Sequence, residues 1–78
     1  MAVEVNMERK AVEITWDTEL VLGDTCNIST ENGDDRSGRN DVKNDGYATL
    51  SYPNDFHGQT LVVVEGSEGG NDEGTITV

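Results

Sequence analysis

The residues of this chain that could do chemistry are carboxylates in abundance, one histidine and one cysteine. Its 78 residues include 16 aspartates and glutamates, while His57 and Cys26 are single representatives of their types. A zinc site takes several nitrogen and sulfur ligands, which one histidine and one cysteine do not supply. The sequence also lacks the nucleophile elbow Gly-x-Ser-x-Gly, the Walker phosphate loop and the zinc motif His-Glu-x-x-His. It therefore predicts a protein that is not an enzyme and needs no cofactor.

Calcium is the metal that the carboxylates could bind, because calcium prefers oxygen ligands. Asp41 and Asp45 have the spacing found at the start of a calcium loop. Lys43 occupies a ligand position, however, and Tyr52 stands where the closing glutamate belongs. Further acidic residues that could bind weakly are Glu31, Asp34, Asp35, Glu68, Asp72 and Glu73. Solvated acidic side chains are the simpler interpretation, so the sequence predicts no metal site and leaves Asp34, Asp35, Asp41 and Asp45 as weak calcium candidates.

The charge of the chain limits its partners. The 16 acidic residues face only 5 lysines and arginines, and the formal net charge is −11. Such a charge repels phosphate backbones and anionic lipid, so neither nucleic acid nor a membrane surface is an expected partner. A basic protein surface would be attracted instead. The N-terminus shows no basic segment followed by an apolar run, so we expect a protein made in the cytoplasm without an export signal.

The length predicts one domain spanning residues 1–78. Only 33% of the residues are hydrophobic, which indicates a thin core. Small domains with thin cores usually gain stability from a metal, a disulfide or a partner. Cys26 is alone and forms no internal disulfide; it alternates with Ile28 on an apolar face, so we expect it in the core.

Alternating apolar residues predict antiparallel strands, and no ten-residue segment has helical periodicity. Val12, Ile14 and Trp16 share one face of the clearest early strand, and residues 2–6 before it indicate an edge strand. Further strands are expected at residues 20–22 and 25–28 (one bent strand or two short ones), 47–52, 61–64 and 75–78. Residues 61–64 are apolar on both faces, which is typical of a central strand. The predicted fold class is all-β, a small antiparallel β-sandwich of six to seven strands.

Residues 29–45 contain a single apolar side chain, Val42, and predict a long polar loop. Loops of this length are uncommon unless they are functional or mobile. Three of the five basic residues, Arg36, Arg39 and Lys43, lie in this segment among several carboxylates. They either pair locally, at about 0–1 kcal/mol for each exposed pair, or they order against carboxylates of a partner.

Trp16 also has two interpretations. It is most simply a core residue, but at the end of its strand, beside Asp17, it could anchor an interface. The predicted partner-binding residues are Arg36, Arg39, Lys43 and Trp16.

The C-terminal half of the chain resembles a known family. The pattern Gly46-x-Ala-x-Leu-x-Tyr-Pro-x-Asp-Phe-x-Gly58, followed by Val62-x-Val64-x-Gly66 and Gly74-Thr-Ile-Thr-Val78, is similar to the last three strands of bacterial and viral immunoglobulin-like domains. The resemblance covers residues 46–78 and, more loosely, residues 11–28. It implies an immunoglobulin-like β-sandwich with an aromatic residue packed under the corner before the last hairpin. The inter-sheet cysteine pair of antibody domains is absent, so the resemblance implies an architecture and no particular activity.

As a short chain made of one such domain, the protein is also similar to the decoration and other accessory virion proteins of tailed bacteriophages. This similarity implies a structural interaction protein on the virion surface, where an oligomer is an option. It would bury a sheet edge and residues 29–45 against a larger assembly, the lattice of a major capsid protein. One alternative is a carbohydrate- or cell-surface-binding module that uses residues 54–57 or 66–72. Another is a calcium-stabilised adhesin domain.

Overall fold

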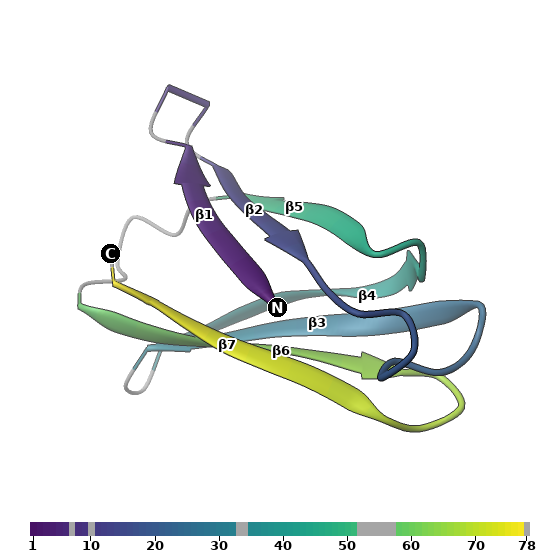
Figure 1. Ribbon diagram of the computed structural model, residues 1–78. Coiled ribbons are helices and arrows are strands. Elements are labelled where there is room, and N and C mark those ends of the chain that lie inside the picture. The colour runs from purple at the N-terminus through teal and green to yellow at the C-terminus, as the bar shows by residue number, and fades with distance from the viewer. Residues whose placement is uncertain (7, 10, 33–34, 52–57, 78) are drawn as a thin grey trace.

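The computed structural model describes residues 1–6, 8–9, 11–32, 35–51 and 58–77, and the described part of the chain folds into strands joined by turns, without a helix. The strands are β1 (Ala2–Asn6), β2 (Ala11–Thr15), β3 (Thr25–Asn32), β4 (Asp35–Lys43), β5 (Tyr47–Ser51), β6 (Gln59–Gly66) and β7 (Asn71–Thr77) (Figure 1). The predicted all-β fold of six to seven strands is confirmed. Tyr52, Asp34 and residues 54–57, which the carbohydrate-binding alternative was expected to use, lie outside the described residues.

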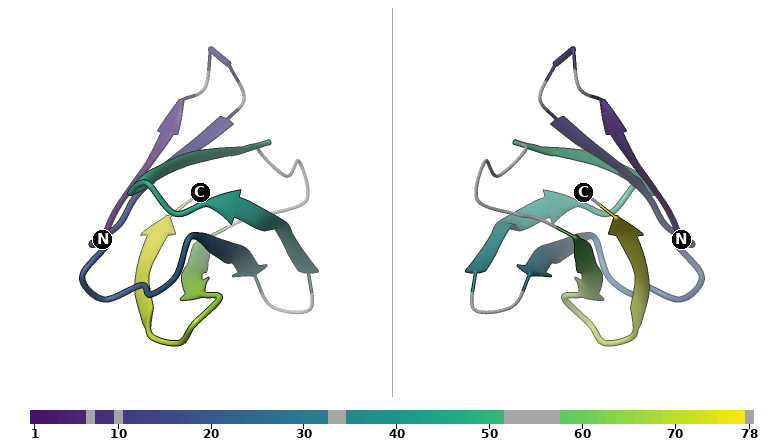
Figure 2. Two further views of the ribbon diagram at one scale, coloured as in Figure 1. Left: turned by 90° about the vertical axis from the view of Figure 1, so that its right-hand side faces the viewer. Right: turned by 90° about the vertical axis from the view of Figure 1, so that its left-hand side faces the viewer.

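Two antiparallel sheets face each other across the core (Figures 1 and 2). One sheet has the strand order β1-β2-β5 and the other has the order β4-β3-β6-β7. Lettered along the chain, these orders are A-B-E and D-C-F-G, whereas immunoglobulin constant domains have ABED and CFG. The fourth strand therefore pairs with the third instead of the fifth. The arrangement is sandwich-like and compatible with an immunoglobulin-like domain.

The core is built from the inward-facing residue of each alternating pair, as the sequence predicts. Strand β2 contributes Val12 and Ile14, and Trp16 follows directly after it. The other buried apolar residues are Val21, Cys26, Ile28, Val42, Ala48, Leu50, Val62 and Val64. The edge position of β1 and the central position of β6 are both confirmed by the strand orders. The predicted core places of Cys26 and Ile28, each 1% exposed, are confirmed as well.

The expectation of a polar loop at residues 29–45 is wrong. Residues 29–32 complete β3 and residues 35–43 form β4, and the two strands pair antiparallel from Thr25↔Lys43 to Asn32↔Asp35. The sequence misleads because the outward positions of β3 carry Asn27, Ser29 and Glu31, while its inward position 30 is filled by a threonine that is 4% exposed. Gly38 also makes the segment look less like a strand, because glycine is depleted in strands. Here glycine is needed, since a side chain would collide with the Ile28 carbonyl oxygen.

The strand expected at residues 20–22 is also absent. Residues 17–24 form a loop between β2 and β3, and only Val21 of this loop enters the hydrophobic core. The loop closes on itself through the Asp17 carbonyl oxygen, which accepts hydrogen bonds from the Leu20 and Val21 amides at 3.0 and 3.3 Å. Asp17 also explains the turn locally, because its side chain accepts a bond from the Glu19 amide at 2.8 Å.

Where β1 lies beside β7, the carboxylate of Asp72 links three segments. Its Oδ2 lies 3.4 Å from the amino group of Met1 and accepts a hydrogen bond from the Asp17 amide at 3.2 Å. Its Oδ1 accepts from the Glu73 amide at 2.9 Å. Asp72 is therefore held as a structural acceptor between the two sheets.

Candidate functional site

The predicted partner-binding cations Arg36, Arg39 and Lys43 all lie on β4, an edge strand of the four-stranded sheet. Arg39 stands opposite Ile28, and its Nη1 donates a hydrogen bond to the Thr49 carbonyl oxygen on β5 at 2.8 Å. Since β5 is the edge of the other sheet, Arg39 ties the two sheets together at this side. Arg39 is thus part of the sandwich and not part of a loop that awaits a partner.

Trp16 is 7% exposed and belongs to the core cluster, so its core interpretation is confirmed. Its Nε1 donates a hydrogen bond to Oδ1 of Asn44 at 2.7 Å, which satisfies the one polar atom of the buried ring. The alternative, an exposed interface anchor at this position, does not fit a side chain buried to this degree.

Of the weak calcium candidates, the structure describes the side chains of Asp41 and Asp45. Asp41 lies opposite Asn27 at a β-bulge of the β3–β4 pair, where its φ is 56°. The backbone amide of Asp41 donates a hydrogen bond to Oδ1 of Asn27. Asp45 lies in the turn before β5 and accepts a bond from the Tyr47 amide at 3.3 Å. Among the side chains that the structure describes, no group of three His, Cys, Asp or Glu comes together to hold a metal ion.

Cys26 is an ionisable residue inside the hydrophobic core, where its side chain is 1% exposed. Burial first, and the carboxylate of Asp45 second, raise the pKa of the thiol above its ordinary value of 9.0. The thiol is therefore kept protonated and unreactive, in agreement with its expected place in the core.

The loop 17–24, called the leucine loop below, presents a surface that the sequence analysis missed. Leu20 is 50% exposed and Leu22 is 48% exposed, although Val21 between them is fully buried. Two leucines in one short loop are therefore left in water while the residue between them anchors the loop in the core. The signal in the sequence was this run of three apolar residues between Glu19 and Gly23, which we interpreted as a strand.

Hydrogen bonds fix the leucine loop against the turn between β6 and β7. The Leu22 amide donates to the Gly69 carbonyl oxygen, and the Glu68 amide donates to the Leu22 carbonyl oxygen, both at 3.0 Å. On the other side, Asn44 Nδ2 donates to the Val21 carbonyl oxygen at 2.8 Å. Gly70 completes the fit, since a side chain there would collide with the Leu20 carbonyl oxygen and contact the Leu22 side chain. The exposed leucines are thus carried on an ordered backbone.

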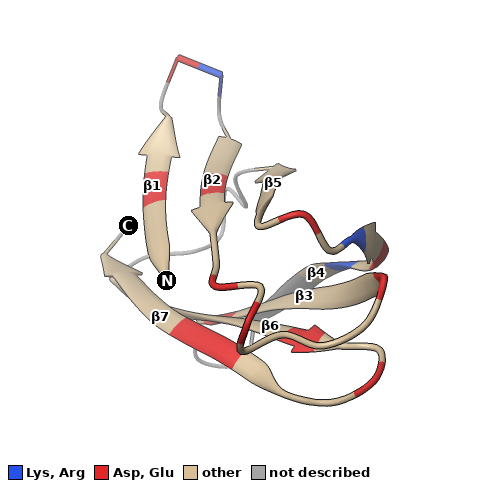
Figure 3. Ribbon diagram, turned by 45° about the vertical axis from the view of Figure 1, so that its right-hand side comes forward, with Lys and Arg blue, Asp and Glu red and all other residues tan. Residues whose placement is uncertain are grey.

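Carboxylates surround this end of the molecule. Glu19 and Asp24 lie in the leucine loop itself, and Glu68 is bonded to it through its backbone amide; all three residues are exposed. Figure 3 shows the acidic positions along the loop between β2 and β3. The surface is therefore apolar at the two leucines and negative around them.

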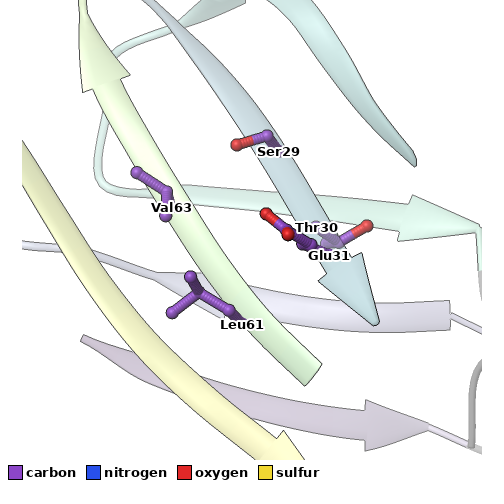
Figure 4. Close-up of a pocket in the computed structure, with 5 residues that line it drawn as sticks. All are labelled: Ser29, Thr30, Glu31, Leu61 and Val63. Atoms are coloured by element: carbon purple, nitrogen blue, oxygen red, sulfur yellow. The ribbon is translucent and has the colours of Figure 1, made fainter. Parts of the chain in front are cut away.

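Each sheet also has a shallow hollow on its outer face. On the three-stranded sheet, a hollow of about 180 Å³ is lined by Ala2, Glu4, Glu13, Thr15 and Tyr47. On the four-stranded sheet, a hollow of about 160 Å³ is lined by Ser29, Thr30, Glu31, Leu61 and Val63 (Figure 4). Tyr47 is 49% exposed and lies on β5, whereas the 66–72 hairpin that a carbohydrate-binding module was expected to use contains no aromatic residue.

Comparisons with protein-family models, with curated proteins and with solved structures find no match to this chain. Within the described ranges, no helix is long and apolar enough to cross a membrane. The argument for a function therefore rests on the surfaces described above.

Proposed function

We propose that this protein is a non-enzymatic interaction protein, an immunoglobulin-like domain that docks on a larger protein assembly. The assembly we propose is the capsid lattice of a tailed bacteriophage, where the chain, made in the host cytoplasm, is a decoration protein on the virion surface. The observation that carries the proposal is the pair of half-exposed leucines on the ordered leucine loop.

The leucine loop has the properties of a docking element. Exposed large apolar side chains that lie together favour an interaction surface. The backbone of Leu22 is already hydrogen-bonded on both sides, so little conformational entropy is lost when a partner covers it. Full burial of an exposed leucine side chain contributes about 1.5–3 kcal/mol. Because Leu20 and Leu22 are 50% and 48% exposed, a partner that covers them gains about half of that for each.

The charge of the protein defines the partner surface further. Glu19, Asp24 and Glu68 surround the leucines, and the whole chain carries −11. The complementary surface is an apolar pocket with lysines or arginines at its rim, because like charges across an interface cost affinity. A partner that binds only the folded form also stabilises a small domain by mass action, which suits a chain with a thin core.

The test is co-sedimentation of the purified protein with virus particles from the organism that encodes it, after the endogenous protein has been stripped off. We expect the wild type to bind the particles. The double variant Leu20→Ser with Leu22→Ser should bind at least about tenfold more weakly, a loss of about 1.4 kcal/mol of binding free energy. The control is Tyr47→Ser, which removes an equally exposed side chain from another face. Particles that neither contain the protein nor bind it, or a double variant that binds like the wild type, would contradict the proposal.

A further inference from the structure

The outer face of the three-stranded sheet carries two glutamates in direct opposition. Glu4 on β1 pairs with Glu13 on β2, so the two side chains leave neighbouring strands on the same face of the sheet. Figure 3 shows an acidic position on each of these two strands, side by side. Like charges directly opposite each other on an antiparallel pair destabilise it. Since no lysine or arginine of the described residues forms an ion pair with Glu4 or Glu13, the pair presents a negative charge that a cation from outside can neutralise.

Tyr47 stands beside this pair. It lies opposite Thr15, two positions along β2 from Glu13, and its hydroxyl donates a hydrogen bond to Oε1 of Glu13 at 3.4 Å. The bond keeps the tyrosine next to the carboxylates, while the residue stays 49% exposed. The face of an exposed aromatic ring also attracts a cation. The ring and the two carboxylates therefore act on a positive charge at the same place on the sheet.

These three side chains line one hollow of the outer face. The hollow has a volume of about 180 Å³ and is completed by Ala2 and Thr15. Small-molecule pockets begin at roughly 300 Å³, so this hollow has the size for one side chain of a partner and not for a metabolite. A bare metal ion does not fit it either, because the described side chains bring no three His, Cys, Asp or Glu together.

From this geometry we infer that the hollow binds an arginine side chain presented by a partner protein. The planar guanidinium group can stack on the ring of Tyr47 while its N–H groups donate to the carboxylates of Glu4 and Glu13. Lysine has a compact, strongly hydrated charge and no plane to stack. A second copy of this chain is not the source of the arginine, because it would bring a further −11 to this face. The inference goes beyond the proposed capsid docking and does not depend on it, because that proposal rests on the leucine loop.

The experiment is a titration followed by the backbone amide signals in NMR spectra. The probes are three acetylated five-residue peptides of glycine and serine with arginine, lysine or citrulline at the centre. Citrulline keeps the shape of arginine and loses the charge. At about 0.1 M salt, where charges more than about 10 Å apart are screened, the arginine peptide should shift the amides of Glu4, Glu13, Thr15 and Tyr47 most. Lysine should bind at least about twofold more weakly than arginine, and citrulline at least about fivefold.

Two variants test the charge and the ring separately. Glu4→Gln should weaken binding of the arginine peptide about twofold to fivefold. It should not lower the melting temperature, because it removes one of two opposed like charges. Tyr47→Leu keeps an apolar side chain but loses the ring, and it should weaken binding by a similar factor. The matched controls on the outer face of the other sheet are Glu73→Gln and Leu61→Ala, which should bind within about 1.5-fold of the wild type.

Four results would overturn the inference. Equal binding of the citrulline peptide would show that charge plays no part, and equal binding of the lysine peptide would show that stacking plays none. Amide shifts spread over both sheets, with Glu73→Gln as harmful as Glu4→Gln, would show a general attraction to an acidic protein. No saturable binding of the arginine peptide even at about 0.01 M salt, where electrostatic attraction is stronger, would show that the hollow takes no such side chain.

Discussion

The indole Nε1 of Trp16 and the side-chain oxygen of Asn44 lie 2.7 Å apart in a hydrogen bond that joins the end of β2 to the turn between β4 and β5. The amide nitrogen of the same Asn44 side chain donates to the carbonyl oxygens of Val21 and Gly23, each at 2.8 Å. One asparagine thus satisfies the buried tryptophan and also ties down the leucine loop that carries the proposed docking surface.

The first prediction is that Asn44→Ala destabilises the protein by about 2–3 kcal/mol, because three partly buried hydrogen bonds of about 1 kcal/mol each are lost. The measurement is urea denaturation followed by Trp16 fluorescence. Asn40→Ala, at an exposed position of β4, is the control and should change the free energy of unfolding by less than about 0.5 kcal/mol. Equal effects of the two substitutions would rule out this role of Asn44.

Sequence periodicity predicted the fold well wherever one face of a strand is apolar. The alternation of Val12, Ile14 and Trp16 identified the inward face of β2, and the run at 61–64 identified the central strand β6. The hairpin of β3 and β4 was missed because Thr30 fills a buried position, so the count of apolar residues fell although the strands form. A hydrophobic pattern detects a strand only where the buried residues are apolar. The backbone can pair equally well where the buried residue is a threonine, because threonine has a high strand propensity.

The candidate site was harder to predict than the fold. Arg39 was singled out because cations are rare in this chain, but its hydrogen bond to Thr49 depends on two edge strands meeting, which no local pattern encodes. For Leu20 and Leu22, the apolar run at residues 20–22 predicted a strand. Their exposure depends on the β6–β7 turn with Gly69 and Gly70, which holds the backbone of the leucine loop in place. This is a tertiary contact, which the local sequence does not indicate.

The second prediction compares two neighbouring glycines of the β6–β7 turn. Gly69 and Gly70 have φ of 109° and 74°, so alanine is strained at both, by about 1–3 kcal/mol. Gly69 has open space around it, whereas a side chain on Gly70 would collide with Leu20. Gly70→Ala should therefore destabilise the protein by about 1–2 kcal/mol more than Gly69→Ala does, as measured by thermal or urea unfolding.

The same pair of variants tests the order of the leucine loop. Gly70→Ala should speed hydrogen exchange at the Leu22 amide, which is bonded to Gly69, because the loop must move to make room. Gly69→Ala serves as the control for backbone strain alone. If the two variants had equal stability and equal exchange rates, Gly70 would not hold the loop.

The third prediction concerns the link between the sheet edges. Arg39→Met keeps the stem of the side chain but removes its hydrogen bond to Thr49, so we expect a loss of about 0.5–1.5 kcal/mol of stability. Faster hydrogen exchange on β5 should accompany the loss. The control is Lys43→Met, which removes a positive charge from the same strand. If Lys43→Met lost as much stability as Arg39→Met, the change in net charge would explain the loss and the hydrogen bond to Thr49 would not.

The last prediction concerns the thiol of Cys26 and has a defined pH range. Burial raises the pKa of the thiol in the folded state above 9.0, while the unfolded chain has the ordinary value. The stability linked to the protonated thiol is therefore fully present below pH 9.0 and is lost as the pH rises through the folded-state pKa. Between the two pKa values the free energy of unfolding should fall by up to about 1.4 kcal/mol per pH unit.

Cys26→Ala separates this contribution from the titration of lysine and tyrosine. The variant is less stable at every pH because a buried side chain is shortened, but its stability should decline less steeply above pH 9.0 than that of the wild type. Native protein should also react slowly with a maleimide at about pH 8, and rapidly once unfolded in urea. Parallel pH profiles for the two proteins, or rapid labelling of the native thiol, would show that Cys26 is reachable by water and that the core opens beside Asp45.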